Sequence, residues 1–156
     1  MIKSRGFTLI ELLVTLAILS VLALLTVPLA QLSARRVDEA ELRHALREIR
    51  NAIDAYKLAS DEGRIERPVN SSGYPPTLNA LVEGVKDAKD PKRRMIYFLR
   101  RVPRNPLADS SLSDEQGWGL RAYSSEPHSP VAGDDVFDVF PRSDGVGLNS
   151  IPYRKW

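Results

Sequence analysis

The residue whose chemistry stands out in this sequence is Glu11, a carboxylic acid among apolar side chains. It lies between the apolar residues 7–10 and an uncharged run of 19 residues, 12–30. A carboxylate at membrane depth is costly, and such residues usually have a partner or a function. The alternative is that Glu11, close to a charged end of the run, reaches water or takes up a proton. Glu11 is therefore a candidate for an ion pair or for a boundary position.

Three other acids have a spacing that could bind metal. Asp134, Asp135 and Asp138 match the Asp-Asp-x-x-Asp pattern of magnesium sites. That pattern needs a helix to bring its first and last acids onto one face, whereas residues 136–140 are β-branched and aromatic and predict a strand. Neither histidine belongs to a nucleophile or metalloprotease motif, and the absence of cysteine excludes thiolate chemistry and disulfides. The sequence therefore predicts a protein that is not an enzyme.

A helix must position Glu11. About 20 apolar residues in a helix span the hydrocarbon core of a bilayer, so residues 7–30 predict a transmembrane helix. The run is longer than the roughly 7–15 apolar residues of a signal peptide, and a plain signal anchor would give Glu11 no role. Pro28 either bends this helix or is tolerated in it. Lys3 and Arg5 precede the run, which favours a cytoplasmic N-terminus and an outward-facing remainder.

The apolar helix continues into an amphipathic one. Residues 31–62 are rich in charge, but their apolar side chains recur at helical spacing and define a single face. This predicted face consists of Leu42, Ala45, Leu46, Ile49, Ala52, Ile53, Tyr56 and Ala59. Gly63 then gives a helix stop, so we expect a stalk helix that packs under the rest of the chain.

Residues 63–156 predict one small globular head. Thr77 and Gly84 are suited to begin and end a short helix at residues 78–83. Two segments rich in β-branched and aromatic side chains predict strands, residues 120–124 and 136–140. The predicted fold class is α+β, with one long N-terminal helix packed against a small antiparallel sheet.

The charge balance argues against nucleic acid as a partner. The formal charge is +2, from 22 Lys and Arg against 20 Asp and Glu, and the signs are mixed along the chain. Removal of residues 1–6 would take away both leading cations and bring the balance to zero. We therefore expect no nucleic-acid role.

The segment from Lys3 to Leu12 resembles a known leader junction. Basic residues, Gly6, the string Phe-Thr-Leu-Ile-Glu and an unbroken apolar run occur in the order seen in type IV pilins and type II secretion pseudopilins. The resemblance implies that residues 1–6 are a leader, that a prepilin peptidase cuts between Gly6 and Phe7, and that the new Phe7 amine is methylated. It also implies that Glu11 pairs with the Phe7 ammonium of a neighbouring subunit, and that Pro28 marks a place where the helix melts in filaments.

The head is similar to the major, G-type pseudopilin family of type II secretion. Short fragments follow the order of that family: Gly73-Tyr74-Pro75, Leu78 to Val82, Val102 to Pro106, Trp118-Gly119, Tyr123, Asp138, Ser143-Asp144-Gly145 and the final Trp156. Residues 107–117 depart from the family pattern as an insertion. Leader and head fragments together cover most of the chain.

The resemblance also implies a calcium loop near the end of the chain. Asp144 matches the first acid of the family's glycine- and aspartate-rich loop, but the later acid is missing and Asn149 is its nearest substitute. Calcium requires several oxygen ligands, so this departure argues against it. No cofactor is required by the sequence, and calcium is the one candidate ion.

The implied function is that of a structural subunit. Such a protein sits in the inner membrane as a single-pass precursor with its head in the periplasm, and it assembles with copies of itself and minor pseudopilins into a filament that drives type II protein secretion. Its other expected partners are the prepilin peptidase, the inner-membrane assembly platform and membrane lipid. A major or minor type IV pilus subunit, serving adhesion, twitching or DNA uptake, is the alternative in the same class. A membrane-anchored extracytoplasmic binding module is the alternative from a different class.

Overall fold

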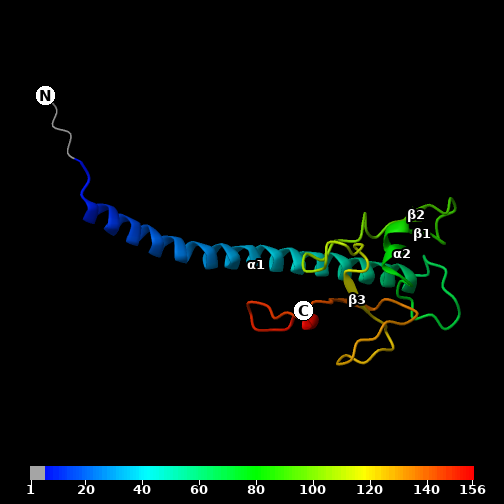
Figure 1. Ribbon diagram of the computed structural model, residues 1–156. Coiled ribbons are helices and arrows are strands. Elements are labelled where there is room, and N and C mark those ends of the chain that lie inside the picture. The colour runs from blue at the N-terminus through cyan, green and yellow to red at the C-terminus, as the bar shows by residue number, and fades with distance from the viewer. Residues whose placement is uncertain (1–5) are drawn as a thin grey trace. The chain divides into compact units, whose positions relative to one another are not determined.

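The computed structural model describes residues 6–156, without the side chains of residues 25–27. Of the predicted leader, residues 1–6, only Gly6 lies within this description. The elements in the described chain are α1 (Leu9–Asp61), α2 (Leu78–Glu83), β1 (Val85–Lys86), β2 (Met95–Ile96), β3 (Trp118–Arg121), β4 (Asp138–Pro141) and the 3-10 helix η1 (Tyr153–Lys155) (Figure 1). This order confirms the predicted α+β class, with a long N-terminal helix followed by a small antiparallel head.

Helix α1 runs through two compact units, which divide between Val37 and Asp38. The helix begins two residues after Phe7 and continues past Pro28 without a break in its helical backbone. Gly63 follows the helix with a positive φ of 71°, a conformation that glycine adopts without steric cost. The predicted helix and its stop are thus confirmed.

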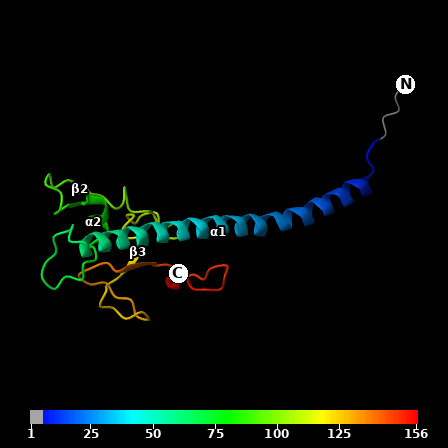
Figure 2. The same cartoon turned by 180° about the vertical axis from the view of Figure 1, so that it is seen from behind.

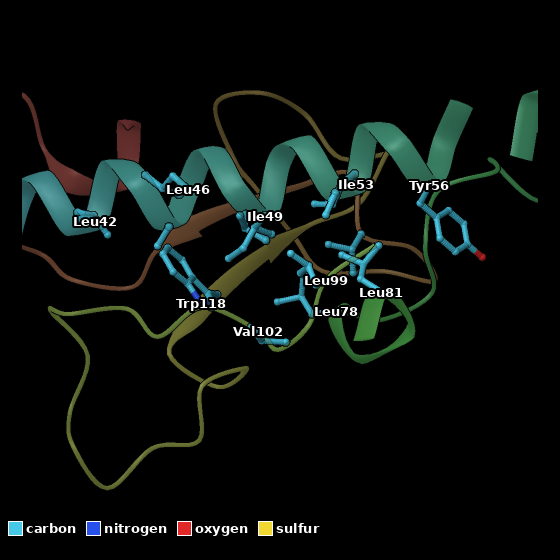
Figure 3. Packing of buried hydrophobic residues seen from close by; sticks show 14 of the residues in the cluster. Leu42, Leu46, Ile49, Ile53, Tyr56, Leu78, Leu81, Leu99, Val102 and Trp118 are labelled. Carbon is cyan, nitrogen blue, oxygen red and sulfur yellow. The ribbon is translucent and has the colours of Figure 1, made fainter. Parts of the chain in front are cut away.

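The core of the second unit lies against one face of α1. All eight apolar residues predicted for this face are buried. Figure 3 shows Leu42, Leu46, Ile49 and Ile53 of α1 directed toward residues of the head. The facing side chains include Leu78, Leu81, Leu99, Val102 and Trp118. Apolar burial of this kind supplies the main driving force for a domain of this size.

Helix α2 is fixed by its two ends. The Thr77 hydroxyl oxygen accepts a hydrogen bond from the Ala80 amide at 3.2 Å, as an N-cap does. Gly84 ends the helix with φ of 76°, and a Cβ at this position would collide with the carbonyl oxygen of Ile96. Both predicted ends of α2 are confirmed, and glycine is required at the second of them.

The strands form two separate antiparallel pairs. In the first pair Val85 of β1 lies opposite Ile96 of β2. In the second, β3 pairs with β4 so that Trp118 faces Pro141. The predicted strand at residues 120–124 was placed too late, because the chain turns after Ala122, where the Ser125 amide donates to the Ala122 carbonyl.

The predicted strand at residues 136–140 begins two residues later in the structure, as β4. Val136 lies outside it because its amide donates to the Pro75 carbonyl at 2.8 Å. The β1 and β2 pair was not predicted, since two residues are too short for an alternating pattern to be visible.

Residues 107–117, predicted as an insertion, form a loop that is closed at its base by Asn105. The buried Asn105 side chain donates from Nδ2 to the Gly117 carbonyl at 2.9 Å and accepts at Oδ1 from the Leu107 amide at 2.9 Å. Trp118, fully buried directly after the loop, donates its ring N–H to the Pro103 carbonyl at 2.8 Å. The loop therefore leaves and rejoins the head at one fixed point.

The last residues of the chain return to α1. Viewed from behind, the C-terminal segment again lies beside the helix, as in the first view (Figure 2). The contact is specific, because the Leu148 amide donates to the Glu39 carboxylate of α1 at 2.7 Å.

Candidate assembly site

The predicted processing junction leads directly into the start of α1. Gly6 and Phe7 are exposed and precede the helix, and nothing approaches the position that a Cβ on Gly6 would take. Thr8 immediately precedes the helix as its N-cap residue, and its carbonyl accepts the Leu12 amide at 3.2 Å. The described part of the junction is thus exposed and lies outside the helix.

Glu11 is held by Thr8 in a reciprocal cap. Glu11 Oε2 accepts from the Thr8 amide at 3.0 Å and from the Thr8 hydroxyl at 2.9 Å. The Glu11 amide in turn donates to Thr8 Oγ1 at 3.3 Å. This is a capping box, which satisfies amide groups that have no partner within the helix.

Through this cap, the Glu11 carboxylate is hydrogen-bonded to Thr8, the residue that directly follows Phe7. If the chain is cut after Gly6, the new ammonium group forms on Phe7, next to Thr8, whose amide and hydroxyl hold the negatively charged Glu11 carboxylate. Sequence reasoning found Glu11 but missed Thr8, although the pattern Thr-x-x-Glu before an apolar run is a recognised helix start.

The apolar part of α1 exposes its side chains all round. It is long and apolar enough to cross a membrane, and none of its most apolar stretch is buried within the chain. Two of its hydroxyl groups bond within the helix: the Thr15 hydroxyl donates to the Leu12 carbonyl at 2.9 Å, and the Ser20 hydroxyl donates to the Leu16 carbonyl at 2.8 Å. Such internal pairing is what a lipid environment demands.

Pro28 lies inside this stretch and cannot donate a backbone hydrogen bond. The carbonyl four residues earlier, that of Leu24, therefore lacks its usual helical donor. Nothing else in the described chain assigns Pro28 a role, so its part in filament assembly stays a prediction.

The two residues predicted for calcium each have a partner of their own. The Asp144 side chain is 90% exposed, and its Oδ1 lies 3.7 Å from Arg154 Nε. Asn149 Oδ1 accepts the Ile151 amide of its own loop at 3.1 Å. Calcium takes about six to eight oxygen ligands, often from several carboxylates. Asp144 already faces a cation and the Asn149 side chain is already hydrogen-bonded, so these two residues do not supply the oxygen ligands that calcium needs.

Two of the three acids with magnesium-like spacing have separate partners. Asp135 Oδ1 accepts the Tyr123 amide at 2.8 Å, while Asp138 Oδ1 accepts Arg50 Nε at 2.8 Å. Within residues 6–156 there is no group of three or more acidic, histidine or cysteine side chains arranged to hold a metal ion. The spacing is accidental, because β4 begins only at Asp138.

A binding module would hold its ligand in a groove, and the described chain has one of about 370 Å³ next to a larger one of about 730 Å³ that is lined by α1 and by loops. The one lysine or arginine that lines the larger groove, Arg67, faces the Asp61 carboxylate at 3.4 Å. The charge of Arg67 is therefore already compensated.

Sequence reasoning did not single out the buried carboxylate of Glu39. Glu39 lies three residues before Leu42 and so extends the buried face of α1 by one turn. That spacing was visible in the sequence, but its partners near the end of the chain were not.

An exposed apolar helix with a capped acid at its start, joined to a small α+β head, defines the pilin-like class of filament subunits. Residues 1–27 match the family described as the prokaryotic N-terminal methylation motif. The chain is also 31% identical to type II secretion system core protein G of Klebsiella pneumoniae, over 99% of this chain and 95% of that protein.

Two further relatives carry the same name. The protein of Dickeya chrysanthemi is 31% identical over 92% of this chain and 80% of its own length, and that of Pectobacterium carotovorum is 31% identical over 86% and 83%. No solved structure matches the chain. The chain belongs to the family of type II secretion system core protein G, the major pseudopilin, which confirms the resemblance seen in the leader and the head.

Membership of this family also explains why the apolar part of α1 is exposed. The matched proteins are structural pseudopilin subunits, and this chain is a membrane-anchored protein through the exposed stretch of α1. Self-assembly and secretion-system partners follow for the family as a whole.

Proposed function

We propose that this chain is made as a precursor, cut between Gly6 and Phe7 by a prepilin peptidase, and assembled into a periplasmic filament that drives type II secretion. The observation that carries the proposal is Glu11, a carboxylate at the start of an exposed apolar helix, next to the amine that cleavage would create. Before assembly the helix rests in the inner membrane, with the N-terminus cytoplasmic and the head in the periplasm.

The role of the subunit is structural rather than catalytic. In the filament, the apolar helix exchanges lipid for the helices of neighbouring subunits, and the Phe7 ammonium of one subunit meets Glu11 of the next. Pairing offsets the desolvation of a buried charge only in good geometry, so this contact sets register more than net stability. Minor pseudopilins and the assembly platform of the inner membrane are the further partners, and nucleic acid is not among them.

Mass spectrometry of the protein from its host tests the processing step. The expected N-terminus is a methylated Phe7. A Gly6→Glu variant should keep its six leading residues and remain in the membrane as unassembled precursor. Recovery of wild-type chains that still begin with Met1 would contradict the proposal.

A gene deletion distinguishes secretion from a pilus role. Loss of exported proteins from the medium, with twitching and DNA uptake unchanged, is expected for a pseudopilin. The reverse pattern would assign the subunit to a type IV pilus. Complementation with the wild-type gene and with the Gly6→Glu variant provides the positive and negative controls.

A further inference from the structure

The end of the chain is held to α1 through a buried carboxylate. Glu39 is 2% exposed, and its Oε1 accepts the Leu148 amide at 2.7 Å and the Tyr153 hydroxyl at 3.1 Å. Its other oxygen, Oε2, accepts Arg43 Nη2 at 3.1 Å. A buried carboxylate is tolerated only when donors satisfy it, and here three donors do so.

Two arginines of α1 complete the attachment. The Arg43 guanidinium stacks over the Trp156 ring, 4.3 Å from its centre, and that ring meets Tyr153 edge-on. Arg50 Nη2 donates to the backbone oxygen of Trp156 at 2.7 Å. We call Glu39, Arg43 and Arg50 together the C-terminal clasp.

The C-terminal loop, residues 143–152, presents hydrogen-bond donors to a carboxylate, whereas a cation site presents oxygen acceptors to a positive ion. In a calcium loop, oxygen atoms converge on a positive ion. In the C-terminal loop, a backbone N–H from Leu148 and the neighbouring Tyr153 O–H converge on the negative charge of Glu39. The acid that could have served a cation, Asp144, instead faces Arg154.

We infer that Glu39 fixes the C-terminal loop through the Leu148 amide and the Tyr153 hydroxyl, so that the head of this pseudopilin folds without a divalent cation. The inference goes beyond the proposed function, because it concerns the head's own fold and holds whether or not the subunit polymerises. It also identifies Glu39 as the residue that positions the loop.

Hydrogen exchange of the full-length chain in detergent micelles tests whether the loop needs calcium and whether Glu39 fixes it. Peptides covering residues 143–153 should exchange at the same rate in EGTA and in millimolar CaCl2. Protection of the loop that appears only with calcium, and disappears in an Asp144→Ala variant, would overturn the inference.

Variants of Glu39 test whether this residue fixes the C-terminal loop. Glu39→Ala should speed exchange of the loop by about tenfold or more, since it leaves buried donors without an acceptor. Glu39→Gln keeps an acceptor oxygen and should have a smaller effect. Glu41→Ala, a change at an exposed acid of the same helix, is the matched control and should leave the loop protected.

The exchange of α2 reports whether the head as a whole remains folded. If Glu39→Ala loosens α2 as well, Tyr153→Phe provides a milder variant that removes only one hydroxyl donor, and faster exchange confined to the loop is expected. Loop protection that is unchanged in both Glu39→Ala and Tyr153→Phe would contradict the role of Glu39.

Discussion

Two carboxylates of α1, Glu11 and Glu39, are both met by N–H and O–H donors, but in different surroundings. Glu11 is exposed and capped by its neighbour Thr8, whereas Glu39 is buried and bonded to residues more than 100 positions away. Sequence alone identified Glu11, because a single acid in an apolar run is conspicuous. It could not identify the role of Glu39, since the partners of a buried acid depend on tertiary packing.

The charge of Glu11 and its capping role can be separated. Glu11→Gln keeps an oxygen for the Thr8 donors but removes the charge, so we expect filament assembly and secretion to fall to background. Thr8→Ala removes the cap, at a cost of about 1 kcal/mol in helix stability, and should retain most secretion. Secretion yield and filament shearing in a deletion strain provide the measurement. Full secretion by Glu11→Gln together with loss in Thr8→Ala would mean that Glu11 acts as a cap alone.

The stability of the head should depend on pH through Glu39. Burial by itself would raise the pKa of the Glu39 carboxyl group, but the Leu148 amide, the Tyr153 hydroxyl and the Arg43 charge outweigh it and leave the pKa below its ordinary value of 4.5. The folded state therefore binds this proton less readily than the unfolded chain. The stabilisation is present above pH 4.5 and is lost as the pH falls through the lowered pKa.

Urea unfolding at pH 7 and at successively lower pH, followed by tryptophan fluorescence, measures this dependence. Other carboxylates also titrate in this range, so the quantity to compare is the difference between wild type and Glu39→Gln. That difference should shrink as the pH falls below 4.5. A difference that stays constant across this range would contradict the assignment.

At the scale of elements, prediction succeeded where the pattern is local. The buried face of α1 follows from spacing alone, and α2 follows from the capping chemistry of Thr77 and Gly84. The strands were displaced by two residues, because the start of β4 is set by a distant backbone partner, the Pro75 carbonyl, and the end of β3 by the turn after Ala122. The two-residue strands β1 and β2 could not be seen at all, since their pairing is purely tertiary.

Pairing of β3 and β4 depends on the absence of a side chain at Gly119. Gly119 lies opposite Phe140, and a Cβ there would overlap the Phe140 ring. Although alanine generally suits a strand better than glycine, Gly119→Ala should destabilise the head by about 1–3 kcal/mol.

Chemical denaturation of the single and double variants checks this cause. Adding Phe140→Leu to Gly119→Ala gives the new methyl group more space, so the two changes should cost less together than the sum of their separate effects. If the losses in the free energy of unfolding were strictly additive, the Phe140 ring would not be the cause of the destabilisation.

At the scale of the whole molecule, the fold class, the membrane helix and the family all follow from the order of motifs along the chain. What the sequence could not reveal is how the end of the chain is secured. Arg50 joins three places at once, since it bonds the Asp138 carboxylate and the Val139 carbonyl of β4 and the oxygen of Trp156. No short-range pattern predicts such a convergence.

Arg50→Ala should therefore lower the free energy of unfolding of the head by about 1–3 kcal/mol, because hydrogen bonds of a charged group to separate partners are lost together. Arg47→Ala, an exposed arginine of the same helix, should change it by no more than about 0.5 kcal/mol. Denaturant midpoints of the full chain in detergent give both values. Equal effects from the two substitutions would mean that Arg50 contributes only its general charge.

The amide lock of Asn105 has a practical consequence for the loop at residues 107–117. Because both ends of this loop are tied to one buried side chain, its tip at Ser110 and Ser111 can change in length without moving Trp118 or the strand that follows. Exposed loop tips of this kind tolerate insertions. An epitope or a fluorophore-binding peptide inserted between these serines should therefore label the subunit in living cells and leave its fold intact.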